Sequence, residues 1–320
     1  MKVLIGPNPM GVESFISELK EKYTDIDFVH CTTHEDILIE IADADIYLGW
    51  LNRETFLAAK NLKWIQSPSS GIDSYMTIPE VAKGDVILTS ASGTHGACLA
   101  ESALAMVLAF TRGIRDCILH QQKHEWTPGD IRSKLVELTG STMGIIGFGT
   151  VGRALAKRAQ IFDMRIIAVD LRPGDKPEYV SELWEMDHLP ELLRQSDYVV
   201  VTVPRTPQTL DMIGSAQLAM MKPGAILIGI SRGGIINQEA LAEALSQKSL
   251  AAAALDVFFP EPLPVDSKLW DMDNLLITPH IAGGTQFESR HIISIFCENL
   301  ERLVQGRMPL RNQVDKHFGF

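Results

Sequence analysis

A glycine-rich turn at residues 147–152 constrains the fold of this chain more than any other feature. The turn reads Gly-Phe-Gly-Thr-Val-Gly, a GxGxxG pattern, and lies between an apolar run at 142–147 and a helical pattern at 150–162. In such a strand–turn–helix unit the first glycine permits the tight turn, the second lets the backbone approach a pyrophosphate, and the third lets the helix pack on the strand. The phosphates then lie at the positive end of the helix. The sequence therefore predicts a dinucleotide site formed by Gly147, Phe148, Gly149, Thr150, Val151 and Gly152.

An acidic residue at the end of the next apolar run supports this prediction. Asp170 closes the run at 165–170 and follows Gly152 by 18 residues, a spacing at which a carboxylate accepts hydrogen bonds from the adenine ribose hydroxyls. Its charge repels a 2′-phosphate and so favours NAD over NADP. Arg172 carries the opposite charge two residues further on, which leaves the strength of the preference for NAD open.

Short apolar runs alternate with helical patterns along the chain, which is typical of parallel α/β sheets. The runs are apolar at both alternate positions, as strands covered by helices on both faces must be. We expect strands at 2–5, 46–50, 64–67, 86–89, 142–147, 165–170, 198–203, 225–230, 251–257 and 274–280. We expect helices at 12–23, 53–60, 98–120, 150–162, 189–195, 238–246 and 287–306. Because 320 residues exceed the usual size of one core, we predict an α/β fold with two doubly wound parallel sheets.

The helix expected at 287–306 follows the last strand of the second series and has no strand of its own. We infer that it returns to the first sheet, which makes the first domain discontinuous. The predicted division is 1–97 together with 287–320 for a substrate domain, and 98–286 for the dinucleotide-binding domain.

The composition excludes several classes of protein. The net charge of −11 disfavours binding to nucleic acid or to an anionic membrane. The start of the chain lacks a signal-peptide core, and the longest apolar stretch, 98–110, is shorter than a membrane span. We expect a cytoplasmic protein without a metal: His120 and His124 lack a third ligand, and no CxxC pair occurs. Four widely spaced cysteines fit a reducing compartment: Cys31, Cys98, Cys117 and Cys297.

Three polar residues follow apolar strands near their carboxyl ends, where parallel sheets bind ligands. They are Arg232, Glu261 and His280. A guanidinium can hold a carboxylate and polarise the adjacent carbonyl, and an imidazole can move the proton on oxygen. A carboxylate beside the imidazole stabilises its charged form. Together these residue types fit reduction of a 2-oxo acid.

Four stretches in a fixed order carry a family resemblance: GFGTVG with Asp170, ISRGGIIN at 230–237, ALDVFFPEP at 254–262 and LLITPHIAGGT at 275–285. On these motifs the sequence resembles the D-isomer-specific 2-hydroxyacid dehydrogenase family over nearly its whole length. The resemblance implies a Rossmann domain inserted into a flavodoxin-like substrate domain, NAD as cofactor, and a homodimer built on the cofactor domain.

The resemblance also implies roles for individual residues. Arg232 would bind the substrate, His280 would be the general acid and base, and Glu261 would pair with the histidine. Further cofactor contacts would come from Val203, Pro204, Thr209, Ile230, Ser231, Asp256 and Gly283, with Asp256 on the nicotinamide carboxamide. Backbone N–H groups of Ser70 and Gly71 would hold the substrate carboxylate, while Trp50 would be either a pocket wall or a buried structural residue. Two positions depart from the family pattern: Gly229, and the stretch 92–96.

The expected substrate is a small 2-oxo acid such as glyoxylate, hydroxypyruvate or pyruvate, reduced to the D-hydroxy acid. The candidate substrate loop, 66–76, contains no basic residue, and a phosphorylated substrate would need more Arg or Lys. Two alternatives stay open: an NADH-binding regulatory protein of corepressor type, and a short phosphoglycerate dehydrogenase. Formate dehydrogenases, a further group of related enzymes, are longer chains with Gln rather than Glu in the acid position. Glu261 therefore disfavours that activity.

Overall fold

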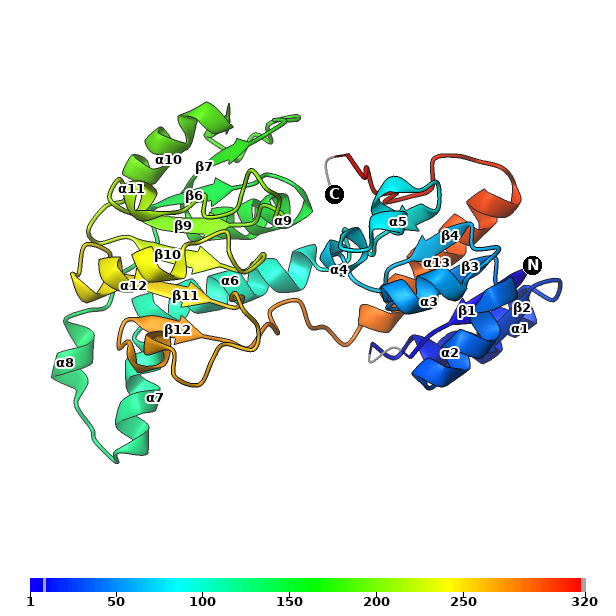
Figure 1. Cartoon of the computed structure of the whole chain (residues 1–320). Helices are drawn as coiled ribbons and strands as arrows, with labels where there is room; N and C mark the ends of the chain where they lie inside the picture. Colours follow the sequence, from blue (N-terminus) through cyan, green and yellow to red (C-terminus); the bar gives the residue numbers. More distant parts are fainter. Residues whose placement is uncertain (8–9, 318–320) are drawn as a thin grey trace. The chain divides into compact units, whose positions relative to one another are not determined.

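The computed structural model describes residues 1–7 and 10–317, which fold into two compact units. Unit 1 consists of Met1–His95 and Thr285–Phe320, and unit 2 of Gly96–Gly284. Each unit is built around one parallel β-sheet (Figure 1). The predicted α/β class with two parallel sheets is confirmed.

Unit 1 contains a five-stranded sheet in the order β2-β1-β3-β4-β5, which is the flavodoxin-like order. Its strands are β1 Lys2–Ile5, β2 Asp27–His30, β3 Ile46–Leu48, β4 Trp64–Gln66 and β5 Ile87–Thr89. Its helices are α1 Ile16–Lys22, α2 His34–Glu40, α3 Arg53–Ala58, α4 Asp73–Met76, α5 Pro79–Lys83 and α13 Glu288–Val304, with short 3-10 turns at Val12–Phe15 and Ile41–Asp43.

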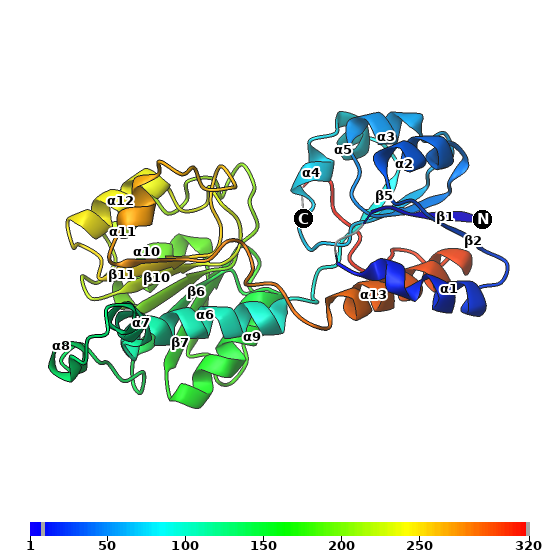
Figure 2. The ribbon, with the colours of Figure 1, turned by 90° about the horizontal axis from the view of Figure 1, so that it is seen from below.

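Helices cover both faces of this sheet (Figure 2). Helices α1 and α13 lie on one face, where Phe296 of α13 stacks on Trp64 of β4 with ring centroids 5.2 Å apart. Helices α2, α4 and α5 lie on the other face around Tyr47 and Tyr75. The apolar pattern on both sides of the strands follows from this two-sided burial.

Unit 2 contains a seven-stranded parallel sheet in the order β12-β11-β10-β9-β6-β7-β8. Its strands are β6 Thr142–Ile146, β7 Arg165–Asp170, β8 Glu182–Glu185, β9 Tyr198–Val201, β10 Ile226–Gly229, β11 Ala252–Leu255 and β12 Leu275–Ile277. Its helices are α6 Gly96–Thr111, α7 Ile114–Gln122, α8 Pro128–Arg132, α9 Thr150–Ala159, α10 Leu189–Gln195, α11 Ser215–Leu218 and α12 Gln238–Ser246, with 3-10 turns at Gln160–Phe162, Met186–His188 and Lys268–Asp271. Strands β6 to β11 have the Rossmann order, and β12 extends it by one strand.

Two apolar clusters cover the faces of the unit 2 sheet. Helices α6 and α9 pack on one face, and α10, α11 and α12 pack on the other (Figure 2). The chain reverses its direction of winding between β6 and β9. In open α/β sheets the crevice beyond the carboxyl ends of the strands at such a reversal is where ligands bind.

The single helix expected at 98–120 is wrong, because the structure has two helices, α6 and α7, bent by 66°. Gly113 lies between them with φ 64°, and its N–H bonds to the carbonyl of Phe110. A Cβ at Gly113 would lie 2.6 Å from Ile131, so the close approach of the following segment requires glycine. Among the described residues no single helix is long and apolar enough to span a membrane; only this bent pair, counted together, passes by length and composition.

Candidate active site

The GxGxxG turn joins β6 to α9 as the pattern predicts. Gly149 caps α9, and a Cβ at Gly149 would meet nothing within 4 Å. A Cβ at Gly152 would lie 2.2 Å from the carbonyl oxygen of Gly147, so the helix can approach the turn only with glycine there. The first N–H groups of a helix have no intrahelical acceptor. The open space in front of them therefore fits the pyrophosphate of a dinucleotide.

Asp170 lies at the end of β7 and is tied to this turn. One carboxylate oxygen accepts from the Phe148 N–H at 2.6 Å, and the other from the Arg172 N–H at 2.8 Å. Phe148 itself is buried, and the guanidinium of Arg153 lies 4.7 Å from its ring centroid. Because a carboxylate offers about four acceptor positions, Asp170 can hold the turn and still accept from ribose hydroxyls.

The loop after β9 contains the predicted residues Val203, Pro204 and Thr209. Val203 is buried against the turn, where its Cγ1 would lie 2.9 Å from a Cβ at Gly147. The Thr209 hydroxyl donates to the Pro204 carbonyl at 2.7 Å and accepts from the Thr206 N–H at 2.8 Å. The side chain of Thr209 thus closes the loop on itself.

The stretch that follows β10 carries Ile230, Ser231 and Arg232. Ile230 is buried, and Arg232 donates from Nη1 to the Ser231 carbonyl at 2.7 Å. A Cβ at Gly233 would lie 1.7 Å from the Phe258 carbonyl oxygen, so glycine lets the Arg232 turn pack directly against the segment after β11. At Gly229 a Cβ would lie 2.8 Å from the side chains of Ile236 and Leu255, so glycine lets these two side chains pack closely on the end of β10.

His280 and Glu261, from the segments that follow β12 and β11, form a hydrogen-bonded pair. The His280 Nδ1 lies 2.8 Å from Glu261 Oε2, and Glu261 Oε1 accepts from the Phe258 N–H at 2.7 Å. The acid is therefore oriented by the backbone, and it holds the imidazole through Nδ1. Since the ring is 48% exposed, Nε2 is left to exchange a proton with a ligand.

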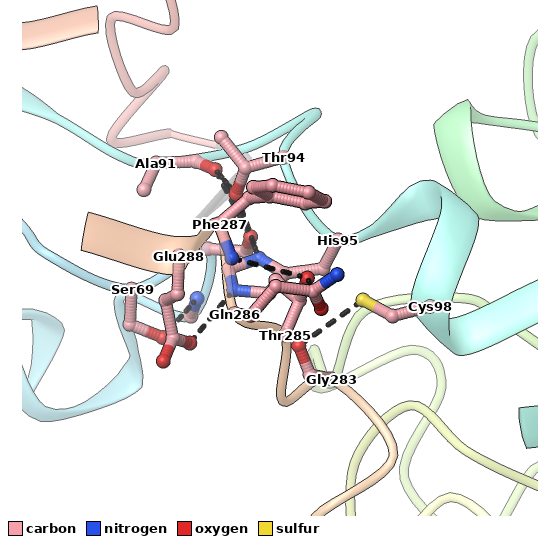
Figure 3. Close-up of polar contacts among 12 residues, drawn as sticks. Ser69, Ala91, Thr94, His95, Cys98, Gly283, Thr285, Gln286, Phe287 and Glu288 are labelled. Atoms are coloured by element: carbon pink, nitrogen blue, oxygen red, sulfur yellow. Dashed lines mark hydrogen bonds and ion pairs between the residues drawn. The ribbon is translucent and has the colours of Figure 1, made fainter. Parts of the chain in front are cut away.

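Asp256, also at the end of β11, is buried and binds the backbone of the His280 segment. Its carboxylate accepts from the Thr278 hydroxyl at 2.6 Å, the Ile281 N–H at 2.9 Å and the Ala282 N–H at 3.0 Å. Its carbonyl accepts from the His280 N–H at 2.8 Å. His280 has a positive φ of 54°, which costs free energy for a residue other than glycine. The hydrogen bonds of Asp256 offset that cost. The adjacent Gly283 carbonyl accepts from the Cys98 thiol at 3.1 Å (Figure 3).

In unit 1, Trp50 follows β3 and is fixed by two buried tyrosines. The Tyr47 hydroxyl donates to the Trp50 carbonyl and the Tyr75 hydroxyl to the Gly49 carbonyl, both at 2.7 Å. Burial raises the pKa of both phenols above the usual range, so they stay protonated donors. The indole of Trp50 stacks on Tyr75 with centroids 6.2 Å apart and is 37% exposed. Trp50 is therefore partly exposed rather than a buried core residue.

Ser70 and Gly71 lie on the loop after β4. The Gly71 N–H donates to Ser69 Oγ at 3.1 Å, while the Ser70 N–H donates to no other residue in the described part of the chain. The Ser70 hydroxyl lies 2.8 Å from Nδ1 of His95. His95 and its partner Glu288 were not among the residues predicted from the sequence, although His95 lies in the stretch 92–96 that departs from the family pattern.

The turn, the acid and the His–Glu pair all lie at the carboxyl edge of one Rossmann sheet, which defines unit 2 as a dehydrogenase-type dinucleotide-binding domain. Residues 104–282 match the family model described as "D-isomer specific 2-hydroxyacid dehydrogenase, NAD binding domain". The chain belongs to the D-isomer-specific 2-hydroxyacid dehydrogenase family.

Curated relatives and solved structures are similar over most of the chain. A glyoxylate reductase of Thermofilum pendens is 36% identical over 87% of this chain and 83% of its own length. A D-3-phosphoglycerate dehydrogenase of Methanocaldococcus jannaschii is 33% identical over 91% of this chain and 56% of its own length, so the chain spans little more than half of that relative. The crystal structure of an NADPH-dependent glyoxylate/hydroxypyruvate reductase from Sinorhizobium meliloti has a TM-score of 0.87 at 25% identity, covering 100% of this chain and 99% of the other.

Proposed function

We propose that this protein reduces a small 2-oxo acid to the D-2-hydroxy acid with a nicotinamide cofactor. The observation that carries the proposal is the Glu261–His280 pair at the same carboxyl edge of the unit 2 sheet as the dinucleotide turn. The bound cofactor would supply the hydride that adds at C2. Nε2 of His280 would donate the proton to the carbonyl oxygen, Glu261 would stabilise the imidazolium, and Arg232 would bind the carboxylate and polarise the carbonyl.

We propose a compact, singly charged substrate of the glyoxylate, hydroxypyruvate or pyruvate type. The relatives named glyoxylate reductase support this choice. In unit 1, Arg53 is the basic residue nearest in sequence to Trp50. Its Nε lies 3.1 Å from the Glu80 carboxylate, and this hydrogen bond holds the pKa of Glu80 below its usual value. Arg53 is thus already paired, which leaves less positive charge for a phosphate.

The substrate is tested by the specificity constants for glyoxylate, hydroxypyruvate, pyruvate, a branched 2-oxo acid and 3-phosphohydroxypyruvate in one buffer. We expect one of the three small acids to exceed the phosphorylated acid by at least about tenfold, or about 1.4 kcal/mol in transition-state free energy. The relatives named D-3-phosphoglycerate dehydrogenase make the phosphorylated acid the second candidate. A tenfold advantage of that acid would replace the proposed substrate, and NADH binding without turnover of any acid would favour a regulatory protein.

We propose that NAD is preferred over NADP, because the Asp170 carboxylate would repel a 2′-phosphate. The specificity constant should be at least about tenfold higher with NADH than with NADPH. Asp170→Asn should lower the ratio of the NADH specificity constant to the NADPH specificity constant. Arg172→Gln, the matched change of the neighbouring charge, should leave the specificity constant for NADH unaltered. A preference for NADPH that Arg172→Gln abolishes would contradict the proposal and assign Arg172 to the phosphate.

We also propose a homodimer that contacts through the α7 segment of unit 2. Helix α7 has no buried residue, and Ile114 and Ile118 on it are each 50% exposed. Trp126, just beyond the helix, is 94% exposed. Apolar exposure of this kind marks interaction surfaces.

Sedimentation velocity tests the dimer directly. The apparent mass of the wild-type protein should be about twice the 35.4 kDa of one chain. Ile118→Asp should reduce the apparent mass to that of the monomer, because the new charge would lie in an apolar interface without a partner. Ile39→Asp is the matched control, since Ile39 is 75% exposed on α2 of unit 1. A monomeric wild type, or an equal shift in both variants, would remove α7 as the interface.

A further inference from the structure

A chain of polar contacts in unit 1 links the substrate loop to the first turn of α13. The Ser70 Oγ lies 2.8 Å from His95 Nδ1, and His95 Nε2 lies 3.2 Å from Glu288 Oε1. Figure 3 shows His95 between Thr94 and Glu288. One imidazole thus connects the loops after β4 and β5 with helix α13.

The charge of Glu288 sets the direction of the hydrogen bond between its carboxylate and the His95 ring. An ionised Glu288 only accepts, so the ring nitrogen that faces it carries the proton. In the neutral ring Nδ1 is then an acceptor, and it lies 2.8 Å from the Ser70 hydroxyl and 2.9 Å from the Thr94 hydroxyl. The Ser70 hydroxyl also lies 3.2 Å from the Ala91 carbonyl. The Thr94 hydroxyl donates to the Ala91 carbonyl at 2.7 Å, which keeps the loop after β5 in place beneath the ring.

Burial makes this connection stiffer than a surface ion pair. The side chains of His95 and Glu288 are 11% and 23% exposed, whereas those of Lys22 and Glu301, another pair that involves α13, are 52% and 44% exposed. Exposed pairs add little because water competes for both partners. Leaving a mostly buried polar group without its partner destabilises the protein. The His95 ring therefore has one preferred position, in which its partners are kept.

The loop held in this way presents the Ser70 N–H as a backbone donor. The Ser67 hydroxyl accepts from the Ser69 N–H at 3.2 Å, and Ser69 Oγ accepts from the Gly71 N–H at 3.1 Å. These bonds order the backbone on both sides of Ser70, and the imidazole holds the Ser70 side chain. Donors that are oriented before binding cost no reorganisation when an anion arrives.

We propose that His95 is a positioning residue for the substrate carboxylate. It holds Ser70 so that the Ser70 N–H, which has no acceptor in the described part of the chain, binds the carboxylate, and Glu288 orients the imidazole through Nε2. The inference rests on the proposed function, because it assigns a role within 2-oxo acid binding. It requires that the loss of His95 weakens binding of the acid without affecting the cofactor or the chemical step.

Two replacements of His95 separate its contact with Ser70 from its contact with Glu288. The amide of Asn lies where Nδ1 lies, so His95→Asn can keep the contact with Ser70 but not with Glu288. The amide of Gln reaches the position of Nε2, so His95→Gln can keep the contact with Glu288 but not with Ser70. Ser70→Ala removes the hydroxyl from the other side. Glu298→Gln is the control, since Glu298 also lies on α13 and pairs with Arg311 at 2.7 Å.

We expect His95→Gln and Ser70→Ala each to raise the KM for glyoxylate about tenfold, with kcat and the Kd for NADH within about twofold of wild type. The double variant should be no worse than either single variant, because both remove the same contact. His95→Asn should have the smaller effect, and Glu298→Gln none. An unchanged KM in His95→Gln, additive single effects, or a parallel loss of NADH binding would overturn the inference.

A binding measurement without turnover separates this inference from the proposed function. Oxalate, a carboxylate that is not reduced, is titrated into the full ¹⁵N-labelled chain while the Ser70 and Gly71 amide signals are observed. Oxalate should shift the Ser70 signal, with about tenfold weaker affinity in His95→Gln. If no 2-oxo acid is reduced but this difference is found, the proposed function fails and the role of His95 stands. Equal oxalate affinity in both proteins would overturn the role of His95 alone.

Discussion

Replacing His280 with Asn should lower the kcat for 2-oxo acid reduction by at least about 100-fold while the Kd for NADH stays near its wild-type value. The imidazole is the proposed proton donor, and losing a positioned general acid costs about 100-fold or more. Asn is the suitable replacement because it tolerates the positive φ of 54° at this position. Steady-state kinetics and NADH fluorescence titration measure the two quantities separately.

The carboxylate partner adds a pH signature to this result. Glu261→Gln should lower reduction at neutral pH, because the amide no longer favours the imidazolium across the 2.8 Å contact. The loss should shrink as the pH is lowered, since abundant protons then keep the imidazole charged without the carboxylate. A constant loss across the pH range would leave Glu261 with a geometric role only.

A second histidine pair provides the control. His188 lies 2.8 Å from Asp187 on the surface of unit 2, so it matches the His280–Glu261 pair in distance but lies outside the candidate site. His188→Asn should leave kcat unchanged. If His280→Asn retained more than about a tenth of the wild-type kcat, another group would have to donate the proton.

The strands of both sheets could be predicted because two-sided burial makes them short apolar runs. Strands β2 and β8 were not predicted, because their sequences lack this apolar pattern. Strand β2 reads Asp-Phe-Val-His and β8 reads Glu-Leu-Trp-Glu, and both lie at a sheet edge where polar ends are tolerated. The break between α6 and α7 was missed because one glycine inside an apolar helical pattern is tolerated in many helices. The positive φ of Gly113 and the close approach of Ile131 show why the bend requires glycine.

The candidate residues at the sheet edge were predictable because parallel strands bring their carboxyl ends together. The sequence placed Glu261 and His280 each after a strand, and adjacent β11 and β12 bring them into contact. The His95–Glu288 contact was not predictable, since the two residues are 193 positions apart. It forms because α13 returns to unit 1 and packs on β4, which local sequence patterns cannot place to within a hydrogen bond.

The structure also adds a role for Asp256 that differs from a contact with the nicotinamide. The residue is 1% exposed, and its carboxylate takes three hydrogen bonds from the segment 278–282. Since these bonds hold His280 at a positive φ, Asp256 determines where the imidazole lies. A residue that only touched the cofactor would have no such partners in the chain.

Asp256→Ala should therefore lower both stability and turnover. The buried Ala282 N–H, the partly buried Ile281 N–H and the partly buried Thr278 hydroxyl would lose their acceptor. A buried group left without a partner costs about 1–3 kcal/mol, so the free energy of unfolding should fall by at least about that amount. With the His280 segment released, kcat should fall by at least about 100-fold in protein that is still folded. Thr278→Val, which removes only the hydroxyl bond, should show a small part of both effects. Denaturant unfolding, kcat and the Kd for NADH are measured on all three proteins. A variant that binds NADH much more weakly but keeps its stability and kcat would show instead that Asp256 acts mainly on the nicotinamide.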